Sequence, residues 1–182
     1  MNMGLSVQVV DKDAFRGVSG YLTIKSSHLT DDHLPALLPL TQLRRLNIAL
    51  NKKFTDIDRL LNALPSLDTL DASGDGITAL GGRLQPVSSR LRVLNVTDNP
   101  LVDVAADAFV GLPRLEVLRL DGARLALSND SFAVQRTTLR KLTLKKCDFT
   151  RSPWRSIAGL SALQTLDMSE VGCGVACTLC SF

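Results

Sequence analysis

The stretch that decides the fold is LRVLNVTDNPLVDVAADAFVGLPRL, residues 91–115. Its first nine residues recur as LRRLNIALN from Leu43, LDTLDASGD from Leu67, LEVLRLDGA from Leu115, LRKLTLKKC from Leu139 and LQTLDMSEV from Leu163. These starting positions (43, 67, 91, 115, 139 and 163) are all 24 residues apart, and the first, fourth and sixth positions are apolar in every copy. The sequence therefore predicts a repeat architecture.

Each unit should contain one short strand, because apolar and outward residues alternate through its centre. The strands are expected at Leu22, Leu46, Leu70, Leu94, Leu118, Leu142 and Leu166, the first of them in a weaker seventh unit that also has Ile24 and Leu29. Stacked units should pair these strands in parallel. The expected fold class is an α/β repeat solenoid, with short helical or 3-10 turns on the side opposite the sheet.

The return half of each unit carries a second apolar set, which should be buried on that opposite, convex side. The set is Leu101, Val104, Phe109 and Leu112 in one unit, and Phe149, Trp154, Ile157 and Leu160 in another. The ninth position reads Ser27, Asn51, Asp75, Asn99, Ala123, Cys147 and Val171. An asparagine amide can satisfy backbone groups in the turn, so we expect the last three turns to be less tightly held, with Cys147 in a structural role.

These motifs resemble the leucine-rich-repeat family over nearly all of residues 19–170. Residues 91–115 are similar to the 24-residue unit of animal extracellular proteins such as Toll-like receptors, Slit and chaoptin. The resemblance implies a horseshoe with a parallel concave sheet, in which that sheet or an edge binds other proteins and the repeats carry no catalysis.

Three segments are expected: an incomplete N-terminal segment at 1–18, a solenoid of about seven units at 19–170, and a cysteine-bearing tail at 171–182. Extracellular members of the family seal both ends with cysteine-bearing caps, but residues 1–18 contain no cysteine and the end CGVACTLCSF lacks the usual tryptophan-containing spacing. We therefore expect both ends to expose core leucines and the chain to associate end to end.

Charge and hydropathy limit the partners only weakly. The net charge is +3 and the pI is near 8.8, too mild to indicate a nucleic acid. Neither a membrane segment nor a targeting signal is visible. Two locations stay open: the cell surface or extracellular space if the chain is a fragment, and the cytoplasm if its N-terminus is authentic.

Two clusters could be drawn as metal or catalytic sites. The spacing of Cys173, Cys177 and Cys180 suits zinc, but no fourth ligand is evident. His28, Asp31, Asp32 and His33 are better explained by a short helix that Thr30 caps, with both aspartates near its positive end. No nucleophile stands in a glycine-rich turn, so we expect no enzyme, metal site or cofactor.

The outward positions of the strands are the expected partner-binding residues. They are Arg45, Asn47, Thr69, Asp71, Val93, Asn95, Val117, Arg119, Lys141 and Thr143. Asn129 and Asn95 also fit the N-glycosylation pattern; a glycan on Asn129 would stand in a return loop, whereas one on Asn95 would block the concave face.

The basic run of Arg140, Lys141, Lys145 and Lys146 invites a polyanion interpretation, but residues 24 apart are neighbours in a parallel stack. We expect Arg140 beside Glu116, Lys145 beside Asp121 and Lys146 beside Glu170. The second position, which reads Arg44, Asp68, Arg92, Glu116 and Arg140, alternates in sign and should form a structural ladder.

The sequence thus favours a binding module, an ectodomain fragment that takes a protein ligand or co-receptor and no nucleic acid. An intracellular adaptor or substrate-recognition subunit is the alternative, and a structural spacer or functionless fragment is a third hypothesis.

Overall fold

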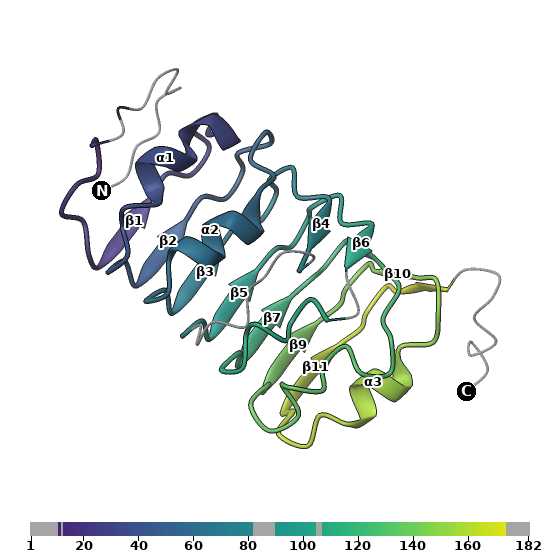
Figure 1. The fold of residues 1–182 in the computed structure, drawn as a ribbon. Coiled ribbons are helices and arrows are strands. Elements are labelled where there is room, and N and C mark those ends of the chain that lie inside the picture. The colour runs from purple at the N-terminus through teal and green to yellow at the C-terminus, as the bar shows by residue number, and fades with distance from the viewer. Residues whose placement is uncertain (1–10, 12, 82–89, 105–106, 174–182) are drawn as a thin grey trace.

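The computed structural model describes residues 11, 13–81, 90–104 and 107–173. Seven strands form one parallel sheet in the order of the chain, from β1 near the N-terminus to β11 (Figure 1). They are β1 (Tyr21–Thr23), β2 (Arg45–Asn47), β3 (Thr69–Asp71), β5 (Val93–Asn95), β7 (Val117–Arg119), β9 (Lys141–Thr143) and β11 (Thr165–Asp167). The predicted strand centres and the parallel pairing are confirmed.

Every strand pairs with its neighbour in a register of 24 residues, so Leu94 lies opposite Leu70 on one side and Leu118 on the other. The first, fourth and sixth residues of most units are buried in the core. Leu94, Leu118 and Leu120 are fully buried. Each unit therefore adds one thin apolar layer to a continuous core.

The convex side holds short helical pieces: η1 (Asp31–His33), α1 (Leu34–Leu37), α2 (Ile57–Ala63) and α3 (Trp154–Ala158). Asp56 caps α2 by accepting a hydrogen bond from the Arg59 backbone N–H at 3.2 Å. Thr30 precedes η1 as expected. The convex apolar set, including Phe109 and Leu160, is buried as predicted, apart from Trp154.

Trp154 is a correction, because 39% of its surface is exposed. The buried residues around α3 are Pro153, Ser156, Ile157 and Leu160, which follow the i, i+3, i+4, i+7 spacing of one helix face. Trp154 lies one residue off that face and so points away from the core.

The chain leaves each strand through a left-handed residue in the eighth position of the unit. The φ angle is positive at Ser26, Leu50, Gly74, Asp98, Gly122, Lys146 and Glu170. Only two of the seven are glycine, so five units adopt this turn at a steric cost that the stacked core must offset.

In the first half of the solenoid, asparagine side chains close the turns. Asn51 Oδ1 accepts from the N–H groups of Ser27 and Leu29 at 3.0 and 2.8 Å, and its Nδ2 donates to the carbonyls of Ile24 and Ile48. Asn99 accepts from Ile77 and donates to Ala72 and Val96 in the same way. A two-stranded sheet of β4 (Ala79–Leu80) and β6 (Asp103–Val104) follows a few residues further on.

In the last three units, whose turns lack asparagine and are expected to be less tightly held, the backbone forms bonds of its own. Directly after positions 123, 147 and 171, the strands β8 (Arg124–Leu125), β10 (Asp148–Phe149) and β12 (Gly172–Cys173) form a parallel sheet. The Asp148 N–H donates to Ala123 O at 3.0 Å, and the Gly172 N–H to Cys147 O at 2.8 Å. Cys147 Sγ also donates to Leu120 O at 3.3 Å, which supports the structural role expected of it.

The two ends of the described solenoid differ. At the N-terminal end Phe15 is part of the core, and Leu22 and Ile24 are fully buried, so the expected exposure of core residues is wrong there. At the C-terminal end the expectation is confirmed, because Leu166 is 40% exposed and Val171 is exposed as well. Among the described residues, no helix is long and apolar enough to cross a membrane.

Candidate binding face

The concave face consists of the outward residues of the seven-stranded sheet, the third and fifth positions of each unit. The strand register arranges them in two rows: Tyr21, Arg45, Thr69, Val93, Val117, Lys141 and Thr165 in one, and Thr23, Asn47, Asp71, Asn95, Arg119, Thr143 and Asp167 in the other. All ten residues predicted for partner binding lie here. Tyr21, Thr23, Thr165 and Asp167 were missed, although the same 24-residue spacing assigns them to this face.

The character of the concave face changes along its length. Tyr21 and Arg45 are exposed near the N-terminal end. Val93 and Val117 are half-buried register partners at the centre and make a small apolar patch. Beyond them come two cations, the exposed Arg119 and the half-buried Lys141. A ligand that crosses the strands would thus meet polar, apolar and basic surface in turn.

The Asn95 side chain is engaged within the concave face. Its Nδ2 donates to Asp71 Oδ1 at 3.1 Å, and its Oδ1 accepts from the Thr97 backbone N–H at 3.2 Å. A glycan would disrupt the bond to Asp71, so Asn95 suits glycosylation poorly. Asn129, the other predicted position, is exposed in a loop on the convex side.

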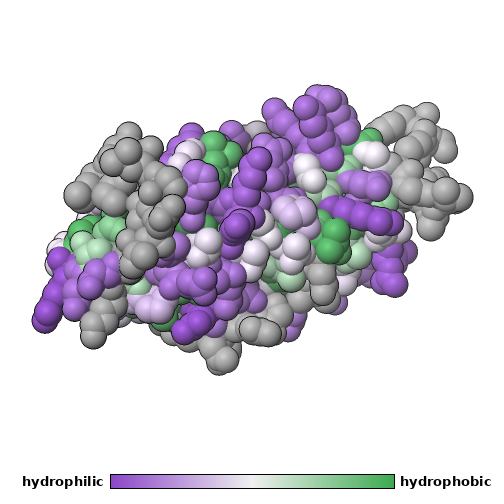
Figure 2. Space-filling model, turned by 90° about the horizontal axis from the view of Figure 1, so that it is seen from above, coloured by the Kyte–Doolittle hydropathy of each residue, from purple (hydrophilic) through white to green (hydrophobic). Residues whose placement is uncertain are grey.

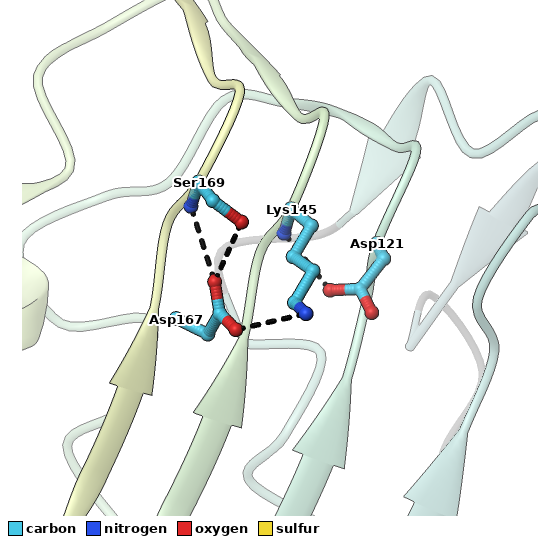
Figure 3. Close-up of polar contacts among 4 residues, drawn as sticks. All are labelled: Asp121, Lys145, Asp167 and Ser169. Atoms are coloured by element: carbon cyan, nitrogen blue, oxygen red, sulfur yellow. Dashed lines mark hydrogen bonds and ion pairs between the residues drawn. The ribbon is translucent and has the colours of Figure 1, made fainter.

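A hollow of about 230 Å³ opens at the carboxyl ends of β7, β9 and β11. It is lined by Arg119, Asp121, Lys141, Thr143, Lys145, Thr165 and Asp167. Lys145 Nζ lies 2.9 Å from Asp167 Oδ2, and Asp121 Oδ1 accepts from the Lys145 backbone N–H at 2.9 Å (Figure 3). Both acidic residues are therefore engaged by Lys145.

Ser169 completes this cluster, as its backbone N–H and hydroxyl both donate to Asp167 Oδ1 (Figure 3). Hydrogen bonds from Lys145 and then Ser169 lower the pKa of Asp167 to about 2. The same contact with Asp167 raises the pKa of Lys145. Both groups therefore stay charged across the physiological range.

The basic run is only partly neutralised in the way the register predicted. Lys146 Nζ reaches Glu170 at 3.9 Å as expected, but Lys145 pairs with Asp167 instead of contacting Asp121 through its side chain. Glu116 turns toward Arg92 at 2.9 Å and leaves Arg140 without an ion pair among the described residues. The second-position ladder consists of the separate pairs Arg44–Asp68 and Arg92–Glu116.

A second hollow, of about 400 Å³, lies on the convex side and includes Asp31, Asp56 and Asp58. All three carboxylates hold the backbone. Asp31 accepts from the N–H groups of Thr55 and Asp56, Asp56 caps α2, and Asp58 accepts from the Gly81 N–H at 3.0 Å. The three carboxylates of this hollow therefore stabilise the turns around it through backbone hydrogen bonds.

The histidine–aspartate cluster of residues 28–33 and the C-terminal cysteines are the two candidate metal or catalytic sites of the sequence. His33 Nδ1 lies 3.0 Å from Thr30 N and 3.0 Å from Thr30 Oγ1, Asp31 binds the next unit, and His28 and Asp32 are exposed. Cys173 ends β12, whereas Cys177 and Cys180 lie outside the described residues. Within the described ranges no three His, Cys, Asp or Glu side chains gather as metal ligands. Burial raises the pKa of the Cys147 thiol to about 11.

The side of the molecule in Figure 2 is mostly hydrophilic, and its hydrophobic side chains form small separate patches. Single exposed apolar residues such as Val102, Val110 and Val134 account for the described hydrophobic surface away from the two ends and the strands. Scattered single apolar residues of this kind are usual on protein surfaces.

Neither a protein-family model nor a curated protein sequence matches the chain. Solved structures do. A crystal structure of a TLR13–ssRNA13 complex superimposes with a TM-score of 0.63 at 21% identity, covering 82% of this chain and 24% of that one. The secreted internalin-like protein Lmo2445 from Listeria monocytogenes gives a TM-score of 0.56 at 19% identity, covering 88% and 56%. The chain thus spans about a quarter and about half of these proteins. Together with the 24-residue register, these likenesses show that the chain folds as a leucine-rich-repeat solenoid.

Proposed function

We propose that the chain is a binding module whose concave face contacts a protein partner. The observation that carries this proposal is the continuity of that face: seven strands in one register present fourteen outward side chains as two parallel rows. The strands stand about 4.8 Å apart on a packed core, so little conformational entropy is lost when a partner binds.

The chemistry of the concave face supports a protein partner over a polyanion. One row holds Arg119 between Asp71 and Asp167, and the other holds only two charged residues, Arg45 and Lys141, whereas a nucleic acid requires several phosphates to be neutralised along one track. TLR13 is seen with ssRNA, but the likeness of this chain to it is one of fold. A catalytic role has no support in the described residues, since the acidic groups around both hollows are engaged in backbone or ion-pair contacts.

We further propose an extracellular or cell-surface setting, as part of a receptor or adhesion protein. The 24-residue unit type and the exposed Asn129 support it. Expression with a secretion signal should add a glycan to Asn129 and none to Asn95. Mass spectrometry of the wild type and of Asn129→Gln would show this, and an unmodified Asn129 would favour the intracellular adaptor.

A matched pair of valine substitutions tests the binding proposal. Val117→Arg places a bulky charge in the centre of the concave face, and Val134→Arg does the same on the convex side. Peptides selected on the wild-type chain from a displayed random library should lose at least tenfold in affinity on Val117→Arg and less than twofold on Val134→Arg. Equal losses, or a loss only on Val134→Arg, would contradict the proposal.

A further inference from the structure

We propose that the hollow between β7, β9 and β11 is a subsite for one acidic side chain of an extended protein segment, held by Arg119 and Lys141. This inference rests on the proposed function and specifies which feature of the partner the concave face recognises. Four observations lead to it: the charge balance of the hollow, a buried hydroxyl in its wall, the apolar patch beside it, and the acidic groups around it.

The charge balance of the hollow leaves two cations free. Lys145 is paired with Asp167, and Asp121 accepts from the backbone of the same lysine. Neither Arg119 nor Lys141 forms an ion pair with any residue in the described part of the chain, although both line the hollow. Two adjacent strands, β7 and β9, supply these cations from diagonal positions of the register, and both side chains line the same hollow.

Thr143 lies in the wall of the hollow with only 5% of its surface exposed. It is the register partner of both Arg119 and Asp167. Its Oγ1 is buried and has no hydrogen-bond partner among the described residues. A buried hydroxyl without a partner is uncommon, and a small rotation of the Thr143 side chain would let it donate a hydrogen bond to a carboxylate oxygen between the two cations.

The apolar patch of Val93 and Val117 lies beside this subsite, because Val117 and Lys141 are register partners in the same row. The centre of the patch is one and a half strand spacings, about 7.2 Å, from Lys141. Side chains on one face of an extended peptide repeat every two residues, at about 6.6–6.8 Å. The geometry therefore fits an apolar residue over the valines and an aspartate or glutamate two residues away.

The surroundings favour a single carboxylate over a chain of phosphates. Asp121 and Asp167 line the same hollow, and Asp71 stands across the valine patch in the neighbouring part of the face. A nucleic-acid backbone that placed one phosphate between Arg119 and Lys141 would bring its next phosphates against these acids. One side chain with one charge avoids that repulsion.

The experiment uses the full chain and the peptides selected on it. Acidic residues should be enriched two positions from an apolar residue. In isothermal titration, Arg119→Gln and Lys141→Gln should each weaken binding about tenfold, whereas Arg140→Gln, which removes an adjacent charge outside the hollow, should change it less than twofold. Changing the acid of the peptide to its amide should weaken binding to the wild type about tenfold. On Lys141→Gln the same change should have little further effect, because the partner of the acid has already been removed.

The outcomes separate the subsite from the proposed function. Peptides that lack an acid but still lose affinity on Val117→Arg would overturn the subsite and leave the binding face standing. Peptides insensitive to Val117→Arg would overturn both. A fifteen-nucleotide oligouridine that binds through Arg119 and Lys141 more tightly than any peptide would also contradict the proposal. Circular dichroism melting curves confirm that each variant is folded.

Discussion

The two halves of the solenoid carry the same strands but close their turns by different chemistry. In the first half, Asn51 and Asn99 bond backbone groups of their own and the preceding unit through their amides. In the second half, Ala123 and Cys147 offer no amide, and the backbone pairs with itself as β8, β10 and β12. The amides of Asn51 and Asn99 accept from N–H groups at the ninth and eleventh positions of the preceding unit, whereas the bonds of the β8–β10–β12 sheet use N–H groups at the tenth and twelfth positions.

Cys147 shows how close the two devices are. Its thiol donates to Leu120 O, the carbonyl 27 residues back, which is the same offset that Asn51 Nδ2 and Asn99 Nδ2 use. The thiol makes one weak bond where the amide makes several. The backbone bonds of β10 satisfy what remains.

The largest effect should separate the halves directly. Asn51→Ala leaves two N–H groups and two carbonyls in a buried turn without their partner, and we expect it to lower the free energy of unfolding by about 2–4 kcal/mol. Cys147→Ala removes one weak bond and a small volume, so we expect about 1 kcal/mol. Urea denaturation of both variants measures the difference. Equal losses would show that the amides are not the main closure of the first half.

Asp75 lies in the first half, at the ninth position of its unit, where the neighbouring units have Asn51 and Asn99. Unlike an asparagine amide, its carboxyl group can titrate. Its Oδ1 accepts from the Asn51 N–H at 2.6 Å, while its Oδ2 is buried without a partner among the described residues. Burial raises the pKa of this carboxyl from 3.8 to about 8. Between about pH 4 and pH 8, the native state therefore keeps a proton on Asp75 that the unfolded state has already released.

Stability should therefore fall as pH rises through that window, by at most about 1.4 kcal/mol per pH unit, and level off above it. Asp75→Asn can donate from Nδ2 to the Ile48 and Ala72 carbonyls, by analogy with Asn51 and Asn99. We expect it to stabilise the chain by about 1–3 kcal/mol at pH 8 and to flatten this slope. Thermal melts across the range check it. An unchanged slope in the variant would mean that another group titrates.

The ends of the two halves differ as well, and this predicts how the chain associates. The N-terminal half ends on Leu22, which is buried in the core together with Phe15, whereas the C-terminal half ends on exposed Leu166 at the edge strand β11. Leu166→Lys should weaken end-to-end association about tenfold, since a charge at a sheet edge opposes pairing. Sedimentation equilibrium over a concentration series measures this. A wild-type chain that stays monomeric at high concentration would contradict the expectation.

The smallest expected effect concerns the charge pairs. Arg92 and Glu116 form a partly exposed pair, and a double-mutant cycle of the two should give a coupling of about 0.2–1 kcal/mol. The equivalent cycle of Arg140 and Glu116 should give none, because Glu116 is already held by Arg92. Coupling of equal size in both cycles would show that Glu116 interacts with Arg92 and Arg140 alike, as a continuous ladder of second-position charges requires.

The repeat period was sufficient to predict the strands, their register and the ten residues of the concave face. Each of these follows from the spacing of leucines alone. The turn closure could not be predicted, because the absence of an asparagine does not say what replaces it. The predicted burial of Trp154 was wrong because a helix of one or two turns can begin one residue earlier or later with the same number of apolar residues. The sequence therefore does not decide which of them faces the core.

The ion pairs formed by the basic run also could not all be predicted from the sequence. The register correctly made Lys145 a neighbour of Asp121, but it also gives that lysine Asp167 on the other side, and geometry decided between them. The 24-residue spacing placed the cations Arg119 and Lys141 on the concave face. The hollow that gathers them with Thr143 required the structure.

The most direct test of the central claim is hydrogen–deuterium exchange on the chain with and without a peptide selected on it. The account predicts new protection along β7, β9 and β11 and in the turns that follow them, with the convex segment around Val134 unchanged. Protection confined to that convex segment or to α2 would show that the partner binds elsewhere, and the concave face would lose its assigned role.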